Sequence, residues 1–134
     1  MMFSAIETDL QPRSMSATRA NPQAPIDRDH LARYTMNDKD LEREILDLFS
    51  QTLAQSVETL TEAENQKDWA MASHTLKGSA RAVGAWQLAA LMEEAEDLNN
   101  RPVKDKARRE LLIDIKAKAA KTKTFIMKLS EHAG

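Results

Sequence analysis

The sequence predicts an all-α protein, an antiparallel up-down-up-down four-helix bundle with a short N-terminal lid helix. Ala, Leu, Lys, Glu, Met and Gln dominate, whereas aromatic residues make up 4% and the chain has three Gly and four Pro. This composition is typical of helical proteins. Apolar residues recur at helical spacing, and no strand-like alternation competes with them. The links between the apolar stripes are short, which favours antiparallel neighbours.

Residues 1–25 differ in character from the rest of the chain. They hold three prolines and scattered Ser, Thr, Asn and Gln without a sustained period, so we expect a flexible tail. The start of the chain lacks the basic and apolar regions of a signal peptide, and no apolar run has the length of a membrane span. We therefore expect a cytoplasmic protein without membrane contact, with its folded domain over residues 26–134.

The lid helix is expected over 26–35. Asp27 is the candidate N-cap, because a carboxylate there can accept a hydrogen bond from a free backbone N–H of the first turn. Leu31 and Tyr34 are expected to face inward. The sequence TMND then ends this helix.

The next two helices are defined by caps and apolar spacing. Asn37 or Asp38 can cap a helix from about 38 to 65, with an apolar stripe of Leu41, Ile45, Leu48, Leu53, Val57 and Leu60. After a short turn, a third helix covers about 67–83, with Trp69, Ala72, Leu76, Ala80 and Val83 on one side. Gly84 ends or bends this helix, because glycine adopts the left-handed backbone found at helix ends.

Two further helices complete the predicted bundle. A helix over about 85–99 is expected to bury Leu88, Leu91, Met92, Ala95 and Leu98. The sequence NNRP is a strong stop signal after it. The last helix is expected over about 103–131. Its other faces are rich in lysine, and its apolar stripe consists of Leu111, Ile115, Ala119, Thr122, Ile126 and Leu129.

His74 is predicted to point away from the core. At about 100° per residue, it lies about 160° from Leu76, which is at the centre of the apolar stripe of its helix. Gly78 shares its side of the helix, although an interior glycine destabilises a helix by about 1 kcal/mol relative to alanine. The same side, between about 100° and 200° from Leu76, carries Ala70, Lys77, Gly78 and Arg81.

This grouping suggests an accessible nucleophile prepared for phosphate. The glycine removes a side chain that would obstruct a macromolecular partner, and Lys77 and Arg81 would favour an anionic group on His74. Each feature alone has a simpler interpretation, because surface histidines and lysines are commonly just solvated. The residues by themselves therefore indicate a phosphate-related site without defining its reaction.

The stretch around His74 resembles the signature of histidine phosphotransfer (HPt) domains. His74-Thr75-Leu76-Lys77-Gly78-Ser79-Ala80, followed by Val83-Gly84-Ala85 and Leu88, meets the fixed positions of that signature at the correct spacing. The resemblance extends over about 26–131. It implies a four-helix bundle in which His74, through Nε2, exchanges a phosphoryl group with the aspartates of receiver domains in a two-component phosphorelay.

The resemblance also implies roles for the neighbouring residues. Lys77 matches the family lysine near the phosphate, Gly78 the glycine that leaves room for the receiver, and Gly84 the glycine between the two motif helices. Glu96 matches a glutamate of chemotaxis-kinase phosphotransfer domains that bonds the imidazole Nδ1–H; otherwise it is one acid among several on a helix edge. Ala70 and Arg81 are candidate docking residues without a fixed family role.

The expected partners are response-regulator receiver domains and a hybrid sensor histidine kinase. Mg²⁺ is expected from the receiver, and this chain is expected to bind no cofactor. It shows no Gly-rich nucleotide loop or Walker pattern, so we expect a phosphoryl carrier and not an ATP-dependent kinase.

Three other interpretations compete with this one. The bundle could be an adaptor that binds a receiver or a kinase without carrying phosphate. A metal-binding bundle is disfavoured, because His30, His74 and His132 share no ligand spacing and the absence of Cys excludes thiolate sites. Nucleic-acid binding by the lysine-rich segment 104–128 is disfavoured by its interspersed acids and by the net charge of −2.

Overall fold

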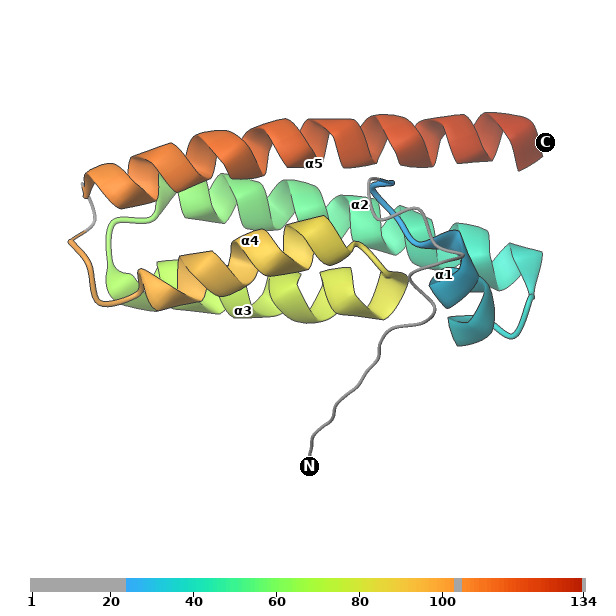
Figure 1. Ribbon diagram of the computed structural model, residues 1–134, viewed down its shortest axis with the longest axis horizontal. Helices are drawn as coiled ribbons and strands as arrows, with labels where there is room; N and C mark the ends of the chain where they lie inside the picture. The colour runs from blue at the N-terminus through green and yellow to red at the C-terminus, as the bar shows by residue number, and fades with distance from the viewer. Residues whose placement is uncertain (1–23, 103–104, 134) are drawn as a thin grey trace, which may run out of the picture.

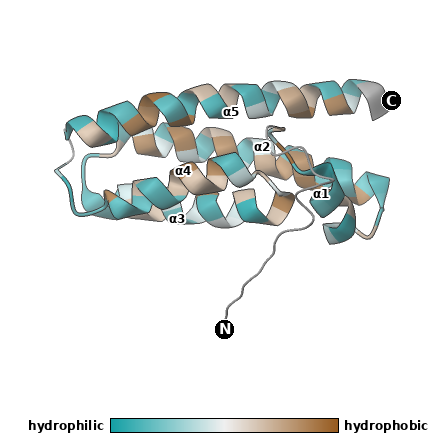
Figure 2. Ribbon diagram, in the orientation of Figure 1, coloured by the Kyte–Doolittle hydropathy of each residue, from teal (hydrophilic) through white to brown (hydrophobic). Residues whose placement is uncertain are grey.

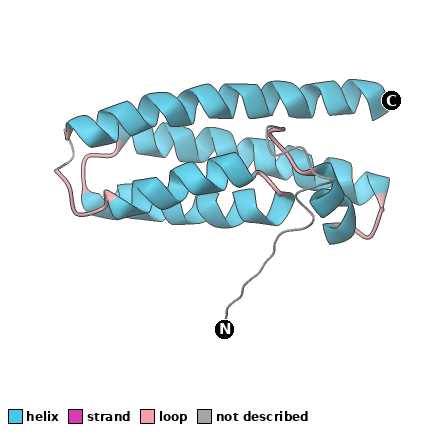
Figure 3. Cartoon of the chain, viewed as in Figure 1, coloured by secondary structure: helices cyan, strands magenta, loops and turns pink. Residues whose placement is uncertain are grey.

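The computed structural model describes residues 24–102 and 105–133, and these form five helices without a strand (Figures 1 and 3). The all-α class is therefore confirmed. The predicted tail over residues 1–25 lies almost entirely outside the described residues. In chain order the helices are α1 (Arg28–Tyr34), α2 (Lys39–Glu62), α3 (Gln66–Val83), α4 (Trp86–Asp97) and α5 (Lys106–Ala133).

The four long helices lie side by side around one apolar core. α3 contacts α2 and α4, and α5 closes the ring by contacting α2 and α4 from the other side. In Figure 1, α5 runs along one long edge of the molecule and α3 along the opposite edge. Hydrophobic residues recur along each long helix between hydrophilic ones (Figure 2), as expected for helices that bury one side.

The helix ends follow from local chemistry. The carboxylates of Asp27 and Asp38 and the amide oxygen of Asn65 accept backbone N–H bonds at the starts of α1, α2 and α3, which satisfies donors that lack a partner within the helix. Gly84 ends α3 with φ of +84°, and a Cβ there would lie 3.0 Å from the Asp27 backbone oxygen. The predicted caps at Asp27 and Asp38 and the stop at Gly84 are confirmed.

α1 is attached to the turn between α3 and α4. The Asp27 N–H donates to the Gly84 carbonyl at 2.9 Å, and His30 Nε2 donates to the Ala82 carbonyl at 3.1 Å. The indole N–H of Trp86 donates to the Asp27 carboxylate at 3.0 Å. These bonds hold α1 against the end of the helix that carries His74.

Two core predictions are wrong. Leu48 is 57% exposed, and Phe49 is buried in its place. A step of five residues from Leu53 turns about 140° around the helix, whereas the step of four to Phe49 turns about 40°. Tyr34, which was expected to face inward, is 54% exposed at the C-terminal end of the seven-residue α1.

Candidate functional site

α3 presents His74 to solvent while its opposite side forms core. Trp69, Leu76 and Ala80 are buried, and the His74 side chain is 80% exposed. The exposure predicted from the helical wheel is therefore confirmed. The buried face fixes the rotation of α3, so it also fixes the direction in which the imidazole projects.

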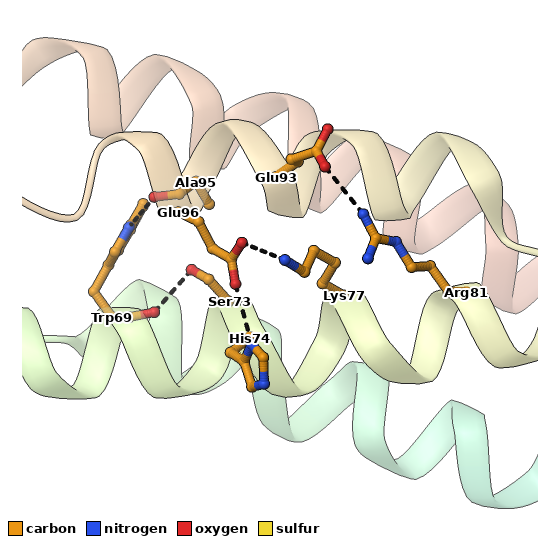
Figure 4. Close-up of polar contacts among 8 residues, drawn as sticks. All are labelled: Trp69, Ser73, His74, Lys77, Arg81, Glu93, Ala95 and Glu96. Carbon is orange, nitrogen blue, oxygen red and sulfur yellow. Dashed lines mark hydrogen bonds and ion pairs between the residues drawn. The ribbon is translucent and has the colours of Figure 1, made fainter. Parts of the chain in front are cut away.

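The two imidazole nitrogens of His74 have different surroundings. Nδ1 lies 3.3 Å from Oε2 of Glu96, which projects from the neighbouring α4 (Figure 4). Nε2 has no hydrogen-bond partner among the described residues and points away from Glu96 (Figure 4). A carboxylate can only accept hydrogen bonds, so this contact favours the neutral tautomer with its proton on Nδ1 and a lone pair on Nε2.

Lys77 shares the same carboxylate. Its Nζ donates to Oε1 of Glu96 at 2.5 Å, and its side chain is only 17% exposed. The wheel placed this lysine with the exposed cations, but most of the side chain is covered where α3 meets α4. The hydrogen bond from Lys77 is the largest influence that holds the pKa of Glu96 below its ordinary value of 4.5, and the His74 contact adds to it against the opposing effect of desolvation. Glu96 is therefore ionised at neutral pH.

The Glu96–Lys77 pair predicts a specific pH dependence of stability. Because the folded-state pKa of Glu96 is lowered, its contribution is complete above pH 4.5 and is lost as pH falls through the folded-state value. The stability gap between the wild type and Glu96→Gln should therefore be largest near pH 7 and shrink towards pH 3 in urea denaturation. Glu94→Gln, which changes an exposed acid of α4 with no described partner, is the matched control. A gap for Glu96→Gln that stays constant with pH would contradict this assignment.

Arg81 does not join this cluster. Its guanidinium donates to Glu93 of α4 at 3.0 Å, and both side chains are more than half exposed. Figure 4 shows this pair displaced along the helices from His74. The structure therefore brings His74, Lys77 and Glu96 together, and places Arg81 in a separate ion pair.

The remaining predicted site residues define open space and a turn. Ala70 is half-buried one turn before His74, and Gly78 is exposed one turn after it. A Cβ built on Gly78 meets nothing within 4 Å, so internal packing does not require glycine there. Gly84 is buried and left-handed at the end of α3, so its requirement for glycine is structural.

A buried arginine supports the site and was missed in the sequence. Arg108 of α5 is 2% exposed and stacks on Trp69, with its guanidinium carbon 4.4 Å from a ring centroid. It donates to the carbonyls of Leu98 and Asn99 just after α4. Burial lowers its pKa, opposed by the charge of Asp105. The helical spacing indicates this burial, because Arg108 lies seven residues before the buried Ile115 and therefore only about 20° from it around the helix.

Trp69 links the buried Arg108 to the residue next to Glu96. Its indole N–H donates to the carbonyl of Ala95 at 2.7 Å (Figure 4), and Ala95 precedes Glu96. Trp69 therefore fixes the register of α4 on α3 at the residue next to the carboxylate. The Trp69–Arg108 stack then joins α3, α4 and α5 at this end of the bundle.

The described part of the chain contains neither a cluster of metal ligands nor a membrane-spanning helix. There, no three His, Asp or Glu residues lie close enough together to hold a metal ion. No helix in the same residues has both the length and the apolar character needed to cross a membrane.

Comparison with known proteins places this geometry in a family. The fold is similar to the crystal structure of histidine-containing phosphotransfer protein B (HptB) from Pseudomonas aeruginosa PAO1, with a TM-score of 0.72 and 18% sequence identity over 82% of this chain and 97% of that one. A comparison with curated protein sequences gave no significant match. The family model described as Hpt domain matches residues 44–121, which is more than half of the 134 residues. The chain therefore belongs to the Hpt domain family.

Proposed function

We propose that this protein is a phosphoryl carrier in which His74 receives a phosphoryl group from the aspartate of one receiver domain and returns it to another. The single observation that carries the proposal is the state of the imidazole. Its Nδ1 faces Glu96 and its Nε2 is free on a side chain that is 80% exposed. Membership of the Hpt domain family supports a role in histidine phosphotransfer within a phosphorelay.

The proposed step is one displacement at phosphorus. The lone pair of His74 Nε2 attacks the phosphorus of a receiver's aspartyl phosphate. The N–P bond forms as the bond from phosphorus to the aspartate oxygen breaks, and the carboxylate leaves with the electron pair. The Nδ1 proton stays on the ring, where Glu96 stabilises the positive charge that develops. The reverse reaction passes the group to the next aspartate.

Lys77 and Glu96 position and stabilise this step. Phosphoryl transfer depends mainly on placement and charge stabilisation. Glu96 orients the imidazole and holds Lys77 near it through the shared carboxylate. To reach phosphoryl oxygens on Nε2, the Lys77 ammonium would have to leave Glu96, because Nε2 points away from that carboxylate (Figure 4). The incoming receiver supplies Mg²⁺ and the acceptor carboxylate, so this chain needs no cofactor of its own and no ATP-binding site.

The docking surface is proposed around His74 on α3. Ala70 and Gly78 flank the imidazole with little bulk, and Arg81 lies beyond them at the edge, where it can contact a receiver. The partners are receiver domains of response regulators and of a hybrid sensor histidine kinase, in the cytoplasm. In this proposal the four long helices form the up-down-up-down bundle and α1 is its lid.

Transfer from a receiver tests the function directly. Incubation of the full chain with receiver domains of the source organism, each first loaded with radiolabelled phosphate, should move label onto this chain from at least one of them. Phosphohistidine is labile in acid and stable in base, whereas an aspartyl phosphate is labile in base. Failure of every receiver to donate label, or label that is stable in acid, would contradict the proposal and favour an adaptor.

Bulk at Gly78 should slow transfer without unfolding the protein. Because a Cβ there meets nothing within 4 Å, Gly78→Ala should stabilise α3 by about 0.5–1 kcal/mol. Gly78→Gln should stay folded but lower the transfer rate by about tenfold or more, which equals a loss of about 1.4 kcal/mol or more. Urea denaturation and a transfer time course measure the two effects.

Ala120→Gln is the control for added bulk. It changes an exposed position on α5, which lies across the bundle from α3. Its transfer rate should equal that of the wild type. Equal rates for Gly78→Gln and Ala120→Gln would show that the glycine does not provide access.

A further inference from the structure

α5 carries a second apolar stripe on its solvent side. Its core side is formed by buried residues such as Leu111, Ile115 and Ile126. On the other side, Ile113 and Met127 are 67% and 63% exposed. Small exposed residues continue the line between them, and the complete stripe, called here the α5 outer stripe, is Ile113, Ala117, Ala120, Thr124 and Met127.

The spacing of the α5 outer stripe is that of a coiled-coil seam. Its members follow one another at steps of four, three, four and three residues, and all lie within about 40° of Ile113 around the helix. Alternation of three and four keeps a continuous line facing one partner helix. The centre of a solvent-facing side is normally polar in a bundle helix, so this stripe is not explained by the fold.

Unneutralised lysines border the stripe on both sides. They lie within about 60° to 80° of Ile113 around the helix and correspond to the flanking positions of a coiled coil, where charges select the partner. Each is exposed and has no partner among the described residues. Residues 115–130 contain no Asp or Glu. The four flanking lysines are Lys116, Lys121, Lys123 and Lys128.

The surface also extends into a groove between α4 and α5. This groove has a volume of about 430 Å³, and Ala117 and Lys121 of α5 line it together with Ala90 and Leu91 of α4. A partner placed along the stripe would therefore gain apolar contact on one side as well. Lys118 is engaged with Gln87 at 2.9 Å, which leaves the flanking lysines as the cations available to a partner.

We infer that the α5 outer stripe is a docking site for an amphipathic helix of another protein, with Asp or Glu on both sides of its apolar seam. Two exposed large apolar side chains at coiled-coil spacing would pack against an apolar seam on the partner helix. The unpaired lysines on both borders would attract acidic residues that flank this seam. A second copy of this chain does not fit, because its own α5 would oppose lysine with lysine in either orientation.

This inference goes beyond the proposed carrier function and does not depend on it. α5 lies on the opposite edge of the bundle from α3 (Figure 1). A helix bound to the α5 outer stripe would therefore leave His74 and its surroundings free. The carrier could remain attached to one protein while exchanging phosphate with receivers.

Designed peptides test the docking site on the full chain. The probe is a helical peptide of about three heptads with Leu at the seam and Glu at the flanking positions. One control peptide carries Lys at those flanks, and another has the Glu peptide's composition in scrambled order. Titration calorimetry should show binding of the Glu peptide alone, weakened by salt. Ile113→Ser with Met127→Ser should weaken this binding by about tenfold or more.

Charge reversal provides the sharper variant. The double variant Lys121→Glu with Lys123→Glu should no longer bind the Glu peptide and should bind the Lys peptide. Lys67→Glu on α3, which changes an exposed lysine without a described partner, should leave the binding of both peptides unchanged. Phosphotransfer should be unaffected in every α5 variant. Equal binding of the ordered and scrambled Glu peptides, or binding of neither, would overturn the inference. Binding of duplex DNA, or of vesicles with about 30% anionic lipid, would also overturn the inference if the lysine variants weaken that binding and the Ile113–Met127 variant does not.

Discussion

Replacing His74 with glutamine is expected to abolish phosphoryl acceptance while the bundle remains folded. The glutamine amide has no nucleophilic nitrogen, since its lone pair is delocalised into the carbonyl. The His74 side chain is 80% exposed, and its polar contact is the 3.3 Å approach of Nδ1 to Glu96. Loss of such a surface contact should change the free energy of unfolding by no more than about 0.5 kcal/mol.

The measurement compares label on the variant and the wild type after incubation with the same phosphorylated receiver. His30→Gln is the matched control, because it makes the same substitution at a ring that bonds the Ala82 carbonyl and is not proposed to react. Per folded molecule, it should accept phosphate at the wild-type level. Acceptance by His74→Gln would place the phosphoryl group on another residue and end the assignment.

Removing the indole ring of Trp69 should destabilise the bundle strongly. Trp69 is 2% exposed, so truncation to alanine should lower the free energy of unfolding by about 3–5 kcal/mol. The change also uncovers the Arg108 guanidinium that stacks on the ring. A loss of this size is a large part of the total stability of a domain, so the alanine variant is expected to be partly unfolded at 25 °C.

A more conservative substitution, to phenylalanine, should destabilise the protein less than truncation to alanine. Trp69→Phe keeps an aromatic ring but removes the N–H that donates to Ala95. The Ala95 carbonyl keeps the bond from the Leu98 N–H but loses its indole donor. The smaller phenyl ring also leaves part of the buried space unfilled, so a loss of about 1–3 kcal/mol is expected. Trp86→Phe is the control, because it removes an N–H whose bond to the half-buried Asp27 is exposed to solvent, and should lose at most about 1 kcal/mol. Guanidinium denaturation measures both, and equal losses would contradict a special role for Trp69.

Local chemistry made much of the fold predictable. The caps at Asp27 and Asp38 and the left-handed stop at Gly84 depend on residues that lie next to one another in the chain. The exposure of His74 followed in the same way, because the apolar positions on α3 fix the rotation of the helix. Leu48 shows the limit of such patterns. The predicted stripe included the five-residue step from Leu48 to Leu53, but the residue that is buried at this level of the helix is Phe49.

Contacts between helices were less predictable. The pairing of Arg81 with Glu93 depends on the register of α4 on α3, which apolar periodicity does not specify. The placement of Glu96 beside His74 was anticipated through the family resemblance and not from the wheel. Arg108 was hidden in a run of charged residues, because a charge in a helix is normally solvated. Its burial depends on the Trp69 ring and on two carbonyls from other parts of the chain.

The most direct test of the central claim identifies the ring nitrogen that carries phosphorus. The full chain, labelled with ¹⁵N in its histidine rings, would be phosphorylated by a cognate receiver and examined by ¹H–¹⁵N and ³¹P NMR in base. Because Glu96 faces Nδ1 and leaves Nε2 free, we predict one phosphohistidine, at Nε2 of His74. Phosphorus on Nδ1 of His74, or on His30 or His132, would contradict the account.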